Sequence, residues 1–412
     1  MKIIKILFII TCVQLNTCAQ QQKSTIKEVE KKNASLKVGA DRIDLYLNKL
    51  KGKNVAIVAN QTSTINVLQR AEVSPNVMGS KMVQHHLVDY LHNYNTINVK
   101  KVFAPEHGFR GKADAGEAIV DGIDIKTQLP IISLYGKNKK PSQEQLKDID
   151  VLIFDIQDVG VRFYTYISTF HYVMEACAEA NIPVLILDRP NPNGHYIDGP
   201  VLELEHKSFV GMHPVPVVYG MTIGEYGQMI NGEKWLNNGI QCDLTIVPIE
   251  GYTHDYKYSL PVKPSPNLPN DKSINLYPSL CFFEGTNVSA GRGTNIQFQI
   301  YGSPHLKGFD FSFTPKSNEG AKYPKHENIV CYGENLTETD ELNHLNLDWL
   351  IKAYQQTKNK ENFFNTFFIK LAGTKKLQQQ IEKGLTENEI KDSWKEDIQK
   401  FKKIRENYLL YN

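Results

Sequence analysis

A short turn at residues 102–111 gathers three side chains that could do acid–base chemistry or bind an anion: Glu106, His107 and Arg110. The residues before the turn are β-branched and aromatic, which is typical of a strand. Pro105 lacks the backbone donor that strand pairing needs, so the strand is predicted to end there. A carboxyl group at this point could serve as a general acid. His107 could orient Glu106, act as a second acid–base group, bind a metal, or be a hydrogen-bonded structural residue.

Three more acidic side chains occupy comparable places. Asp155 and Asp188 stand at the carboxyl ends of two predicted strands, and Glu284 lies in a glycine-rich turn. Open α/β sheets bind ligands at that edge. Hydrolysis of a glycoside requires one acid that protonates the leaving oxygen and a second group that stabilises or traps the sugar cation. Structural roles stay open as well, since each acid could cap a helix, pair with a nearby arginine or hold its loop through backbone N–H groups.

Arginines and aromatic residues are concentrated in the same loops. Arginine binds carboxylates through two parallel hydrogen bonds, so a substrate with a carboxylate would account for them. Ion pairs that brace the loops would account for them equally well. Aromatic rings could stack on the apolar face of a sugar, although a core position is the commoner fate of such rings. The arginines are Arg110, Arg162, Arg189 and Arg292, and the aromatic residues are Phe163, Tyr164 and Tyr166.

The elements that would position these groups alternate between strands and helices. Residues 55–59, 150–155 and 183–187 are apolar runs of strand length, and residues 167–180 have a helical pattern. This order is typical of βαβ units, so the predicted fold class is α/β with a mostly parallel sheet. Further predictions are helices at 41–49, 83–91 and 222–231, strands at 214–218, 244–247 and 297–301, and helices from about residue 348 onward.

A stretch rich in proline, residues 261–278, interrupts the regular pattern and marks a domain junction near residue 262. The predicted organisation is a signal peptide at 1–19, a flexible lead-in at 20–39, a catalytic domain at 40–262 and a C-terminal α+β domain at 263–412.

The first nineteen residues have the pattern of an export signal. Lys2 and Lys5 flank an apolar run at 3–13 that is too short to cross a bilayer. Two processing sites compete: the residues before Gln20 resemble a signal-peptidase site, and residues 15–18 resemble a lipobox that would make Cys18 the acylated first residue. Either site predicts an exported bacterial protein, in the periplasm or anchored to the outer membrane.

Composition and motifs argue against several classes of function. The net charge of +2, from 47 basic and 45 acidic residues, does not indicate a nucleic-acid partner, and basic runs at 137–140 and 400–403 are expected to be solvated surface. Phosphate loops, dinucleotide fingerprints, nucleophile elbows and H-E-x-x-H spacings do not occur, so neither a cofactor nor a metal is predicted. The four cysteines beyond residue 20 lack metal-binding spacing and are expected to be buried free thiols: Cys177, Cys242, Cys281 and Cys331.

Over about residues 40–412 the chain resembles the exo-β-N-acetylmuramidase family, long catalogued as a domain of unknown function. The resemblance is carried by several motifs in the same order: Phe-Ala-Pro-Glu-His-Gly-Phe-Arg-Gly (103–111), Ser-Leu-Tyr-Gly (133–136), Phe-Asp-Ile-Gln-Asp-Val-Gly-Val-Arg-Phe-Tyr-Thr-Tyr (154–166), Asp-Arg-Pro-Asn-Pro (188–192), Pro-Ser-Pro-Asn-Leu-Pro (264–269) and Phe-Glu-Gly-Thr-Asn-Val-Ser-Ala-Gly-Arg-Gly-Thr (283–294).

The resemblance implies a Rossmann-like N-terminal domain, a smaller α+β C-terminal domain and an active-site cleft between them. It implies hydrolysis of terminal, non-reducing N-acetylmuramic acid from peptidoglycan fragments (muropeptides or disaccharides) in cell-wall turnover or recycling. An arginine in the cleft would bind the lactyl carboxylate of that sugar. Glu106 matches the glutamate of the family's Pro-Glu-His-Gly motif and would be the general acid. Asp155, Asp158, Tyr164, Glu284, water and the acetamido group of the substrate all stay open as the second catalytic group.

Two sets of site residues are therefore expected. The catalytic set is Glu106, His107, Asp155, Tyr164 and Glu284. The substrate-binding set is Arg110, Gln157, Asp158, Arg162, Tyr166, Asp188, Arg189, Asn191, Asn267, Asn287 and Arg292. Two rival functions are a wall-fragment binding protein with an inactive site and a hydrolase of an amide or phosphate ester bond.

Overall fold

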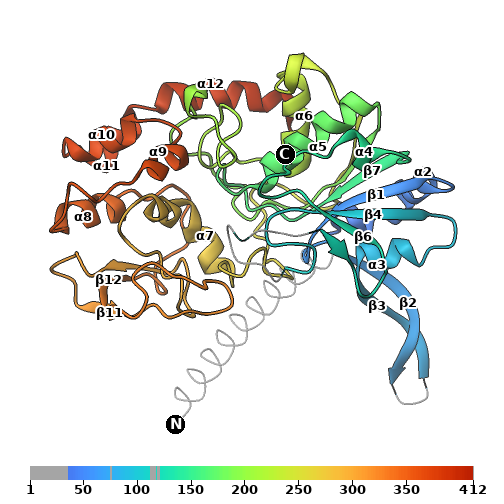
Figure 1. Ribbon diagram of the computed structural model, residues 1–412, viewed down its shortest axis with the longest axis horizontal. Coiled ribbons are helices and arrows are strands. Elements are labelled where there is room, and N and C mark those ends of the chain that lie inside the picture. The colour runs from blue at the N-terminus through green and yellow to red at the C-terminus, as the bar shows by residue number, and fades with distance from the viewer. Residues whose placement is uncertain (1–35, 75–76, 112–116, 118–120, 412) are drawn as a thin grey trace, which may run out of the picture.

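The computed structural model describes residues 36–74, 77–111, 117 and 121–411. Figure 1 shows a large sheet flanked by helices, coloured blue to green, beside a second part in yellow to red that consists mainly of helices and a small sheet. The prediction of an α/β fold with a smaller C-terminal domain is confirmed. The predicted signal peptide and most of the predicted lead-in lie outside the described residues.

The N-terminal domain is built on a seven-stranded sheet with the order β5-β6-β4-β1-β7-β8-β9. All neighbouring pairs are parallel except β5, which pairs antiparallel with β6 at one edge. Polar groups that follow the parallel strands are therefore delivered to one common edge. The strands are β1 (Asn54–Ala59), β4 (Asn98–Ala104), β5 (Gly122–Ile123), β6 (Pro130–Ser133), β7 (Val151–Asp155), β8 (Val184–Leu187) and β9 (Leu244–Val247).

Each face of this sheet has its own hydrophobic core, which explains why its strands are continuous apolar runs. In β1, Ala56 and Val58 belong to the core that contains α5 (Tyr166–Ala180) and α6 (Ile223–Gly232). Val55 and Ile57 belong to the core on the other face, with α2 (Leu47–Leu50) and α3 (Leu87–His92). Alternation of side chains along the strand produces this division. A short helix, α4 (Gln143–Leu146), precedes β7 and carries a capping box at Ser142.

A long hairpin replaces part of a predicted helix. Residues 83–91 have helical spacing, yet Val83 lies on strand β3 (Val77–His86), opposite Val67 of β2 (Thr64–Ser74). The helix starts only at Leu87, where the imidazole of His86 accepts from the backbone N–H of Val88 at 3.3 Å. The predicted placement of His85 and His86 on a helix is therefore wrong. Figure 1 shows the hairpin projecting away from the sheet.

Three other predicted elements differ locally from the structure. The helix at 41–49 is broken into η1 (Gly39–Asp41), η2 (Ile43–Leu45) and α2, and the Asp41 carboxylate accepts from Asn66 N of β2 at 2.7 Å. Residues 214–218 make only isolated bridges, since two prolines remove backbone donors. The strand at 297–301 starts only at Ile300, because Phe298 has a left-handed φ of 52°.

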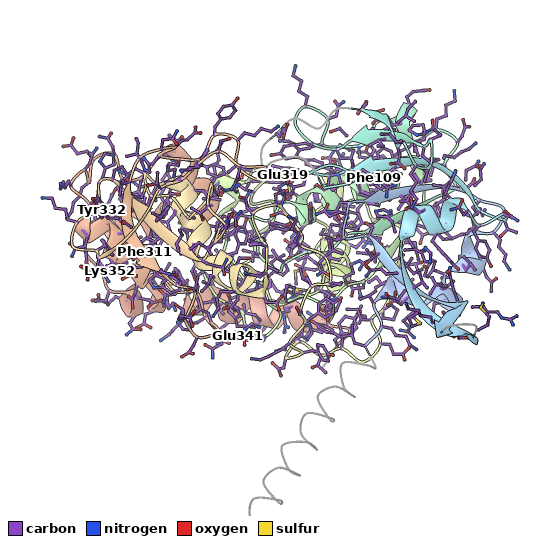
Figure 2. All side chains as sticks on the ribbon, turned by 90° about the horizontal axis from the view of Figure 1, so that it is seen from below. Phe109, Phe311, Glu319, Tyr332, Glu341 and Lys352 are labelled. Carbon is purple, nitrogen blue, oxygen red and sulfur yellow. The ribbon has the colours of Figure 1, made fainter. Side chains whose placement is uncertain are left out.

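The C-terminal domain packs helices on a three-stranded antiparallel sheet of order β10-β12-β11. Figure 2 shows Phe109 of the N-terminal domain on the opposite side of the molecule from Phe311, Tyr332 and Lys352, with Glu319 between them. The elements are α7 (Asp271–Leu280), η5 (Cys281–Gly285), β10 (Ile300–Ser303), β11 (Phe311–Phe313), β12 (Cys331–Asn335), α8 (Asp348–Gln356), α9 (Thr366–Ala372), α10 (Lys376–Glu382), α11 (Glu387–Asp392) and α12 (Lys395–Arg405).

Arg162 ties the two domains together. Its guanidinium is fully buried and donates to Pro200 O at 2.7 Å and Val215 O at 2.8 Å in the N-terminal domain. It also donates to Leu371 O at 2.9 Å and Ala372 O at 2.7 Å in the C-terminal domain. Gly373, with a φ of 72°, permits this approach, because a Cβ there would lie 2.8 Å from Arg162 Nη2.

The end of the chain returns to the N-terminal domain. Helix α12 crosses over it, and Arg405 donates to Gly220 O at 2.9 Å (Figure 1). The backbone N–H groups of Leu410 and Tyr411 then donate to Glu225 Oε1 at 2.8 and 3.2 Å. The junction is therefore braced on several sides.

Cys177, Cys242, Cys281 and Cys331 are buried free thiols, as predicted. Among the described residues, no helix is both long and apolar enough to span a membrane.

Candidate active site

A cavity of about 680 Å³ opens between the two domains at the carboxyl edge of the sheet. The N-terminal domain lines it with loops that follow β4, β6 and β7, which carry Glu106, Tyr135 and Tyr164. The C-terminal domain lines it from α7 and η5 and the loop after them, which carry Glu284 and Arg292. A cavity of this size accommodates a sugar or small oligosaccharide end.

Glu106 is held at the wall of the cavity by two hydroxyl groups. It is 9% exposed, and Thr165 Oγ1 donates to its Oε2 at 2.6 Å. Tyr135 stands on its other side: burial, the charge of Glu106 and a hydrogen bond with that carboxyl group raise the pKa of Tyr135 above its usual range. The carboxyl group thus has a fixed orientation toward the cavity.

The backbone after Glu106 turns sharply. His107 and Gly108 both have left-handed φ values, 69° and 74°. A non-glycine residue in this region is uncommon and marks a position that the surrounding structure enforces. The turn brings the His107 side chain to the same cavity as Glu106. Glu106 and His107 therefore line one cavity, and their catalytic roles stay predictions.

Glu284 is paired with Arg292 at the opposite wall. Arg292 Nε and Nη2 lie 2.7 and 2.6 Å from Glu284 Oε1, and both side chains are 25% exposed. Lys325 anchors this loop, because its ammonium donates to the backbone oxygens of Phe283, Thr286 and Val288. Burial lowers the pKa of Lys325 to about 8, against the opposing charge of Glu284.

Aromatic rings form much of the cavity lining. Tyr277 packs edge-on against Phe163, Tyr164 and Phe298, with ring centroids 5.5, 5.9 and 4.9 Å away. Tyr323 also lines the cavity and is 91% exposed, which leaves its ring free to contact a ligand at the cavity mouth. These rings could stack on a sugar face.

Six of the predicted site residues meet in this cavity: Glu106, His107, Tyr164, Asn267, Glu284 and Arg292. They come from both domains and from four separate loops. Their catalytic and binding roles stay predictions. Tyr164 is constrained within the site, since its hydroxyl donates to Pro264 O at 3.0 Å and burial raises its pKa well above the usual value.

Asp155 and Arg189 do not reach the cavity, although both follow sheet strands. Arg189 Nε and Nη2 donate to the two carboxylate oxygens of Asp155 at 2.6 and 2.9 Å, and Asp155 is fully buried. Arg189 also donates to Thr64 O at 2.8 Å. This closed ion pair braces the base of the β2–β3 hairpin, so the prediction that Asp155 and Arg189 face the substrate is wrong.

Asp188 likewise has a structural role, because its carboxylate is hydrogen-bonded within the N-terminal domain and at the C-terminus. Its carboxylate accepts from Gly224 N at 2.9 Å, Thr222 Oγ1 at 2.7 Å and Tyr411 Oη at 2.7 Å, at the start of α6. Burial raises its pKa to about 6. Its predicted contact with substrate is therefore wrong, and the helix-capping alternative holds.

The loop after β7 and the loop after β8 brace each other rather than the ligand. Gln157 Nε2 donates to Pro190 O at 2.6 Å, and Asn191 Nδ2 donates to Met221 O at 2.8 Å. Asp158 is buried against Gly160 N at 2.7 Å and the hydroxyl of Tyr219. Burial raises the pKa of Asp158 to about 6. None of these three side chains lines the cavity, contrary to the prediction.

Four further predicted binding residues lie outside the cavity lining. Arg162 is the domain tie described above. Arg110 pairs with Asp89 at 3.0 Å and Asp124 at 2.7 Å. Tyr166 lies behind Tyr164 and accepts from Asn60 Nδ2 at 2.9 Å. Asn287 Nδ2 donates to Asn362 O at 3.1 Å.

Several lining residues were missed by sequence reasoning. Thr165 and Tyr135 stand in two of the motifs that carry the family resemblance, 154–166 and 133–136, so their position could have been noticed. Lys139 was expected on solvated surface, yet it lines the cavity; Lys140 pairs with Glu175 at 2.7 Å. Lys325 carries no sequence pattern that would reveal it, because its partners are backbone oxygens about forty residues away.

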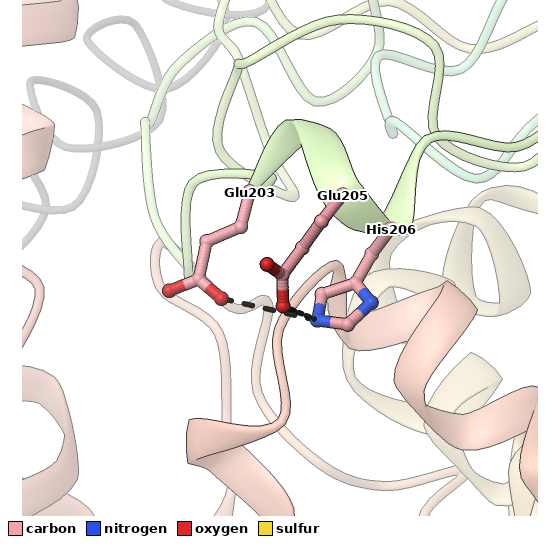
Figure 3. A group of neighbouring side chains, drawn as sticks. All are labelled: Glu203, Glu205 and His206. Atoms are coloured by element: carbon pink, nitrogen blue, oxygen red, sulfur yellow. Dashed lines mark ion pairs between the residues drawn. The ribbon is translucent and has the colours of Figure 1, made fainter.

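One group of described residues could offer three metal ligands: Glu203, Glu205 and His206, at η3 (Leu204–His206) (Figure 3). His206 Nε2 lies 3.1 Å from Glu205 and 3.9 Å from Glu203. Glu203 is already bonded to Lys376 Nζ at 2.7 Å and Thr374 Oγ1 at 2.9 Å. The lysine supplies the positive charge, so the group is an ion-pair cluster, and none of its members lines the cavity.

Comparison with known proteins gives consistent matches over nearly the whole chain. The family models described as exo-beta-N-acetylmuramidase NamZ, N-terminal and C-terminal, match residues 55–272 and 275–411. The chain is 39% identical over 393 residues to the peptidoglycan beta-N-acetylmuramidase NamZ of Bacillus subtilis, covering 89% of each chain. Two crystal structures of DUF1343 family proteins from Bacteroides fragilis cover 92% of this chain and 99% of their own, with TM-scores of 0.81 and 0.73 at 46% and 28% identity.

Proposed function

This chain belongs to the exo-beta-N-acetylmuramidase NamZ family, and we propose that its interdomain cavity is where a glycosidic bond of peptidoglycan is hydrolysed. The protein is a glycoside hydrolase, a peptidoglycan β-N-acetylmuramidase. One observation carries the assignment of the site: Glu106 of one domain and Glu284 of the other line the same cavity. Most glycoside hydrolases use a pair of carboxyl groups that flank the scissile glycosidic bond.

Glu106 is proposed as the general acid. As the bond between the anomeric carbon and the leaving oxygen breaks, the proton of Glu106 passes to that oxygen. Thr165 and Tyr135 fix the carboxyl group from two sides, which keeps the proton directed at one place. Such fixed geometry removes much of the entropic cost of proton transfer.

Glu284 is proposed as the second group. Its carboxylate, held by Arg292, can stabilise the positive charge at the anomeric carbon or accept a proton from the attacking water. The oxygen of that water forms the new bond to the anomeric carbon. Asp155 and Asp158 lie outside the cavity lining, and the Tyr164 hydroxyl is engaged with Pro264, so these alternatives are disfavoured.

The substrate proposed is the terminal, non-reducing N-acetylmuramic acid of a peptidoglycan fragment, in cell-wall turnover or recycling. The test is release of p-nitrophenol from p-nitrophenyl β-N-acetylmuraminide by the purified protein. Release is expected, with much slower action on the matching N-acetylglucosaminide and no change on adding a chelator. Absence of release from the muraminide would overturn the proposal, and loss of activity with the chelator would favour metal-dependent hydrolysis.

We further propose that the protein is exported and reaches the periplasm or the outer membrane of a bacterium. The support is the apolar run at 3–13 with Lys2 and Lys5 beside it, a segment outside the described residues. Mass spectrometry of the mature N-terminus tests this. A mature chain starting at Gln20 means a cleaved soluble form, an acylated Cys18 means a lipoprotein, and an intact Met1 would contradict export by this route.

A further inference from the structure

The basic side chains of the cavity are not equally available to a ligand. Among the described residues, the lysines and arginines that line it are Lys139, Arg292 and Lys325. Arg292 directs Nε and Nη2 at Glu284, and Lys325 directs its ammonium at three backbone oxygens. Recruiting either one would therefore break contacts that hold the loop of Glu284.

Lys139 differs from both. Its Nζ lies 4.6 Å from the centroid of the Phe209 ring, and no carboxylate within the described chain forms an ion pair with it. A cation over an aromatic face is held in place while its charge stays open to a further partner. Lys139 is therefore the cavity cation that can accept an anion at the smallest structural cost.

The position of Lys139 relates it to the proposed acid. Phe209 packs against Tyr135, with ring centroids 6.0 Å apart, and Tyr135 is hydrogen-bonded to Glu106. The acid and the cation thus occupy one continuous wall, joined through two aromatic rings. A sugar whose glycosidic oxygen lies at Glu106 would present its ring substituents along this wall.

The proposed substrate carries a negative charge that Lys139 could bind. N-acetylmuramic acid differs from N-acetylglucosamine by a lactyl ether that ends in a carboxylate. Of the two acids, Glu106 is proposed to carry the proton, so the carboxylate of Glu284 is the one that repels such an anion across the partly enclosed cavity. A cation that forms no ion pair with either glutamate offsets that repulsion. Its attraction for the carboxylate lets the site distinguish the two sugars.

We infer that Lys139, seated on Phe209, binds the lactyl carboxylate of the muramic acid and makes the site selective for that sugar. The inference rests on the proposed function of the cavity and assigns its anion contact to a lysine rather than to one of the four arginines singled out in the sequence. Arg110, Arg162 and Arg189 lie outside the cavity lining, and Arg292 serves Glu284.

The test compares Lys139→Met with the wild type on two chromogenic β-N-acetylmuraminides, one with a free lactyl carboxylate and one with that group converted to an amide. Methionine keeps an unbranched apolar stem beside Phe209 and removes the charge. On the free acid, kcat/KM should fall about 10- to 100-fold, mostly through KM, as expected for loss of one charge-assisted hydrogen bond. On the amide it should change less than about twofold.

Two controls sharpen the comparison. Lys137→Met removes a charge from the same loop at an exposed position outside the cavity lining and should leave both substrates unaffected. Lys139→Arg keeps the charge and should recover most of the activity on the free acid. Equal losses on both substrates, or no loss on either, would overturn the assignment to Lys139.

Binding of free N-acetylmuramic acid, measured by calorimetry, separates this inference from the proposed function. If the wild type hydrolyses no muraminide but binds the free acid, and Lys139→Met weakens that binding at least about tenfold, the hydrolase proposal fails and the carboxylate site stands. If the wild type is active and Lys139→Met binds the acid normally, the carboxylate site fails alone. Absence of both activity and binding overturns both.

Discussion

The hydroxyl of Thr165 donates a 2.6 Å hydrogen bond to Glu106 Oε2. The two residues are 59 positions apart, yet the parallel order of β4, β1 and β7 brings their loops together. Thr165 also immediately precedes the first residue of α5, a helix of 15 residues. The positive end of that helix dipole therefore lies near the proposed acid and adds to the field around it.

Thr165→Val should lower kcat about 10-fold with little change in KM, since the Glu106 carboxyl group loses a hydrogen bond but stays in the cavity. Thr165→Ser keeps the hydroxyl group and should recover most of the rate. Steady-state kinetics on the chromogenic muraminide measure both variants. An unchanged kcat for Thr165→Val would mean that this hydroxyl group does not position the acid.

Glu106→Gln should reduce kcat by at least about 10²-fold, because the amide has no proton to donate to the leaving oxygen. Binding of N-acetylmuramic acid should persist, since the shape of the side chain is kept. Glu284→Gln is the matched comparison from the opposite wall. Normal turnover by Glu106→Gln would show that Glu106 is not the general acid, and loss of turnover in Glu284→Gln would then make Glu284 the candidate for that role.

Arg162→Met should destabilise the protein by at least about 3 kcal/mol, because four buried carbonyl oxygens lose their donor at once. Burial lowers the pKa of Arg162 to about 9, so removal of the charge offsets part of this loss without replacing the four hydrogen bonds. Denaturant unfolding measures the effect. Arg70→Met, at an exposed position on the hairpin, should stay within about 0.5 kcal/mol of the wild type.

Asp158 should make the wild type more stable as the solution is acidified. Burial raises its pKa from the ordinary 3.8 to about 6, so the folded state binds a proton that the unfolded state lacks between these values. Its contribution is full below 3.8 and is lost as pH rises through about 6.

Asp158→Asn removes this titration. The stability of the wild type relative to the variant should therefore be greater at pH 4 than at pH 7 by on the order of 2 kcal/mol, measured by denaturant unfolding at each pH. Asp310→Asn, at an exposed position, is the matched control for removal of one aspartate. A constant difference between wild type and Asp158→Asn across this range would contradict the prediction.

Strands β1, β4, β7, β8 and β9 could be predicted because they are apolar runs of the right length, whereas the short edge strands β5 and β6 were not predicted. Ile57 is buried in the core on one face of the sheet and Phe154 in the core on the other. Because both faces are covered, the run that contains each residue is hydrophobic along its whole length. The hairpin was not predictable from the same criteria. Val83 and Leu87 have helical spacing, yet Val83 lies on strand β3, which pairs with β2, and α3 begins only at Leu87.

The site was only partly predictable for a related reason. A polar residue at the end of a strand can point into a cavity, as Glu106 does, or back into the domain, as Asp155 does. The difference depends on partners distant in sequence: Thr165 for Glu106, and Arg189 for Asp155. Lys325 shows the limit most clearly, because its partners are carbonyl oxygens that every residue possesses.

The same property of the backbone has an evolutionary consequence at Arg162. All four acceptors of its guanidinium are main-chain oxygens, two from each domain. Substitutions at those four positions leave the oxygens in place, so the tie depends on the main chain there, while packing in the core still limits the side chains of Val215, Leu371 and Ala372. Evolution is therefore expected to constrain the side-chain identity at positions 162 and 373 more strictly than at the four positions whose oxygens accept from the guanidinium.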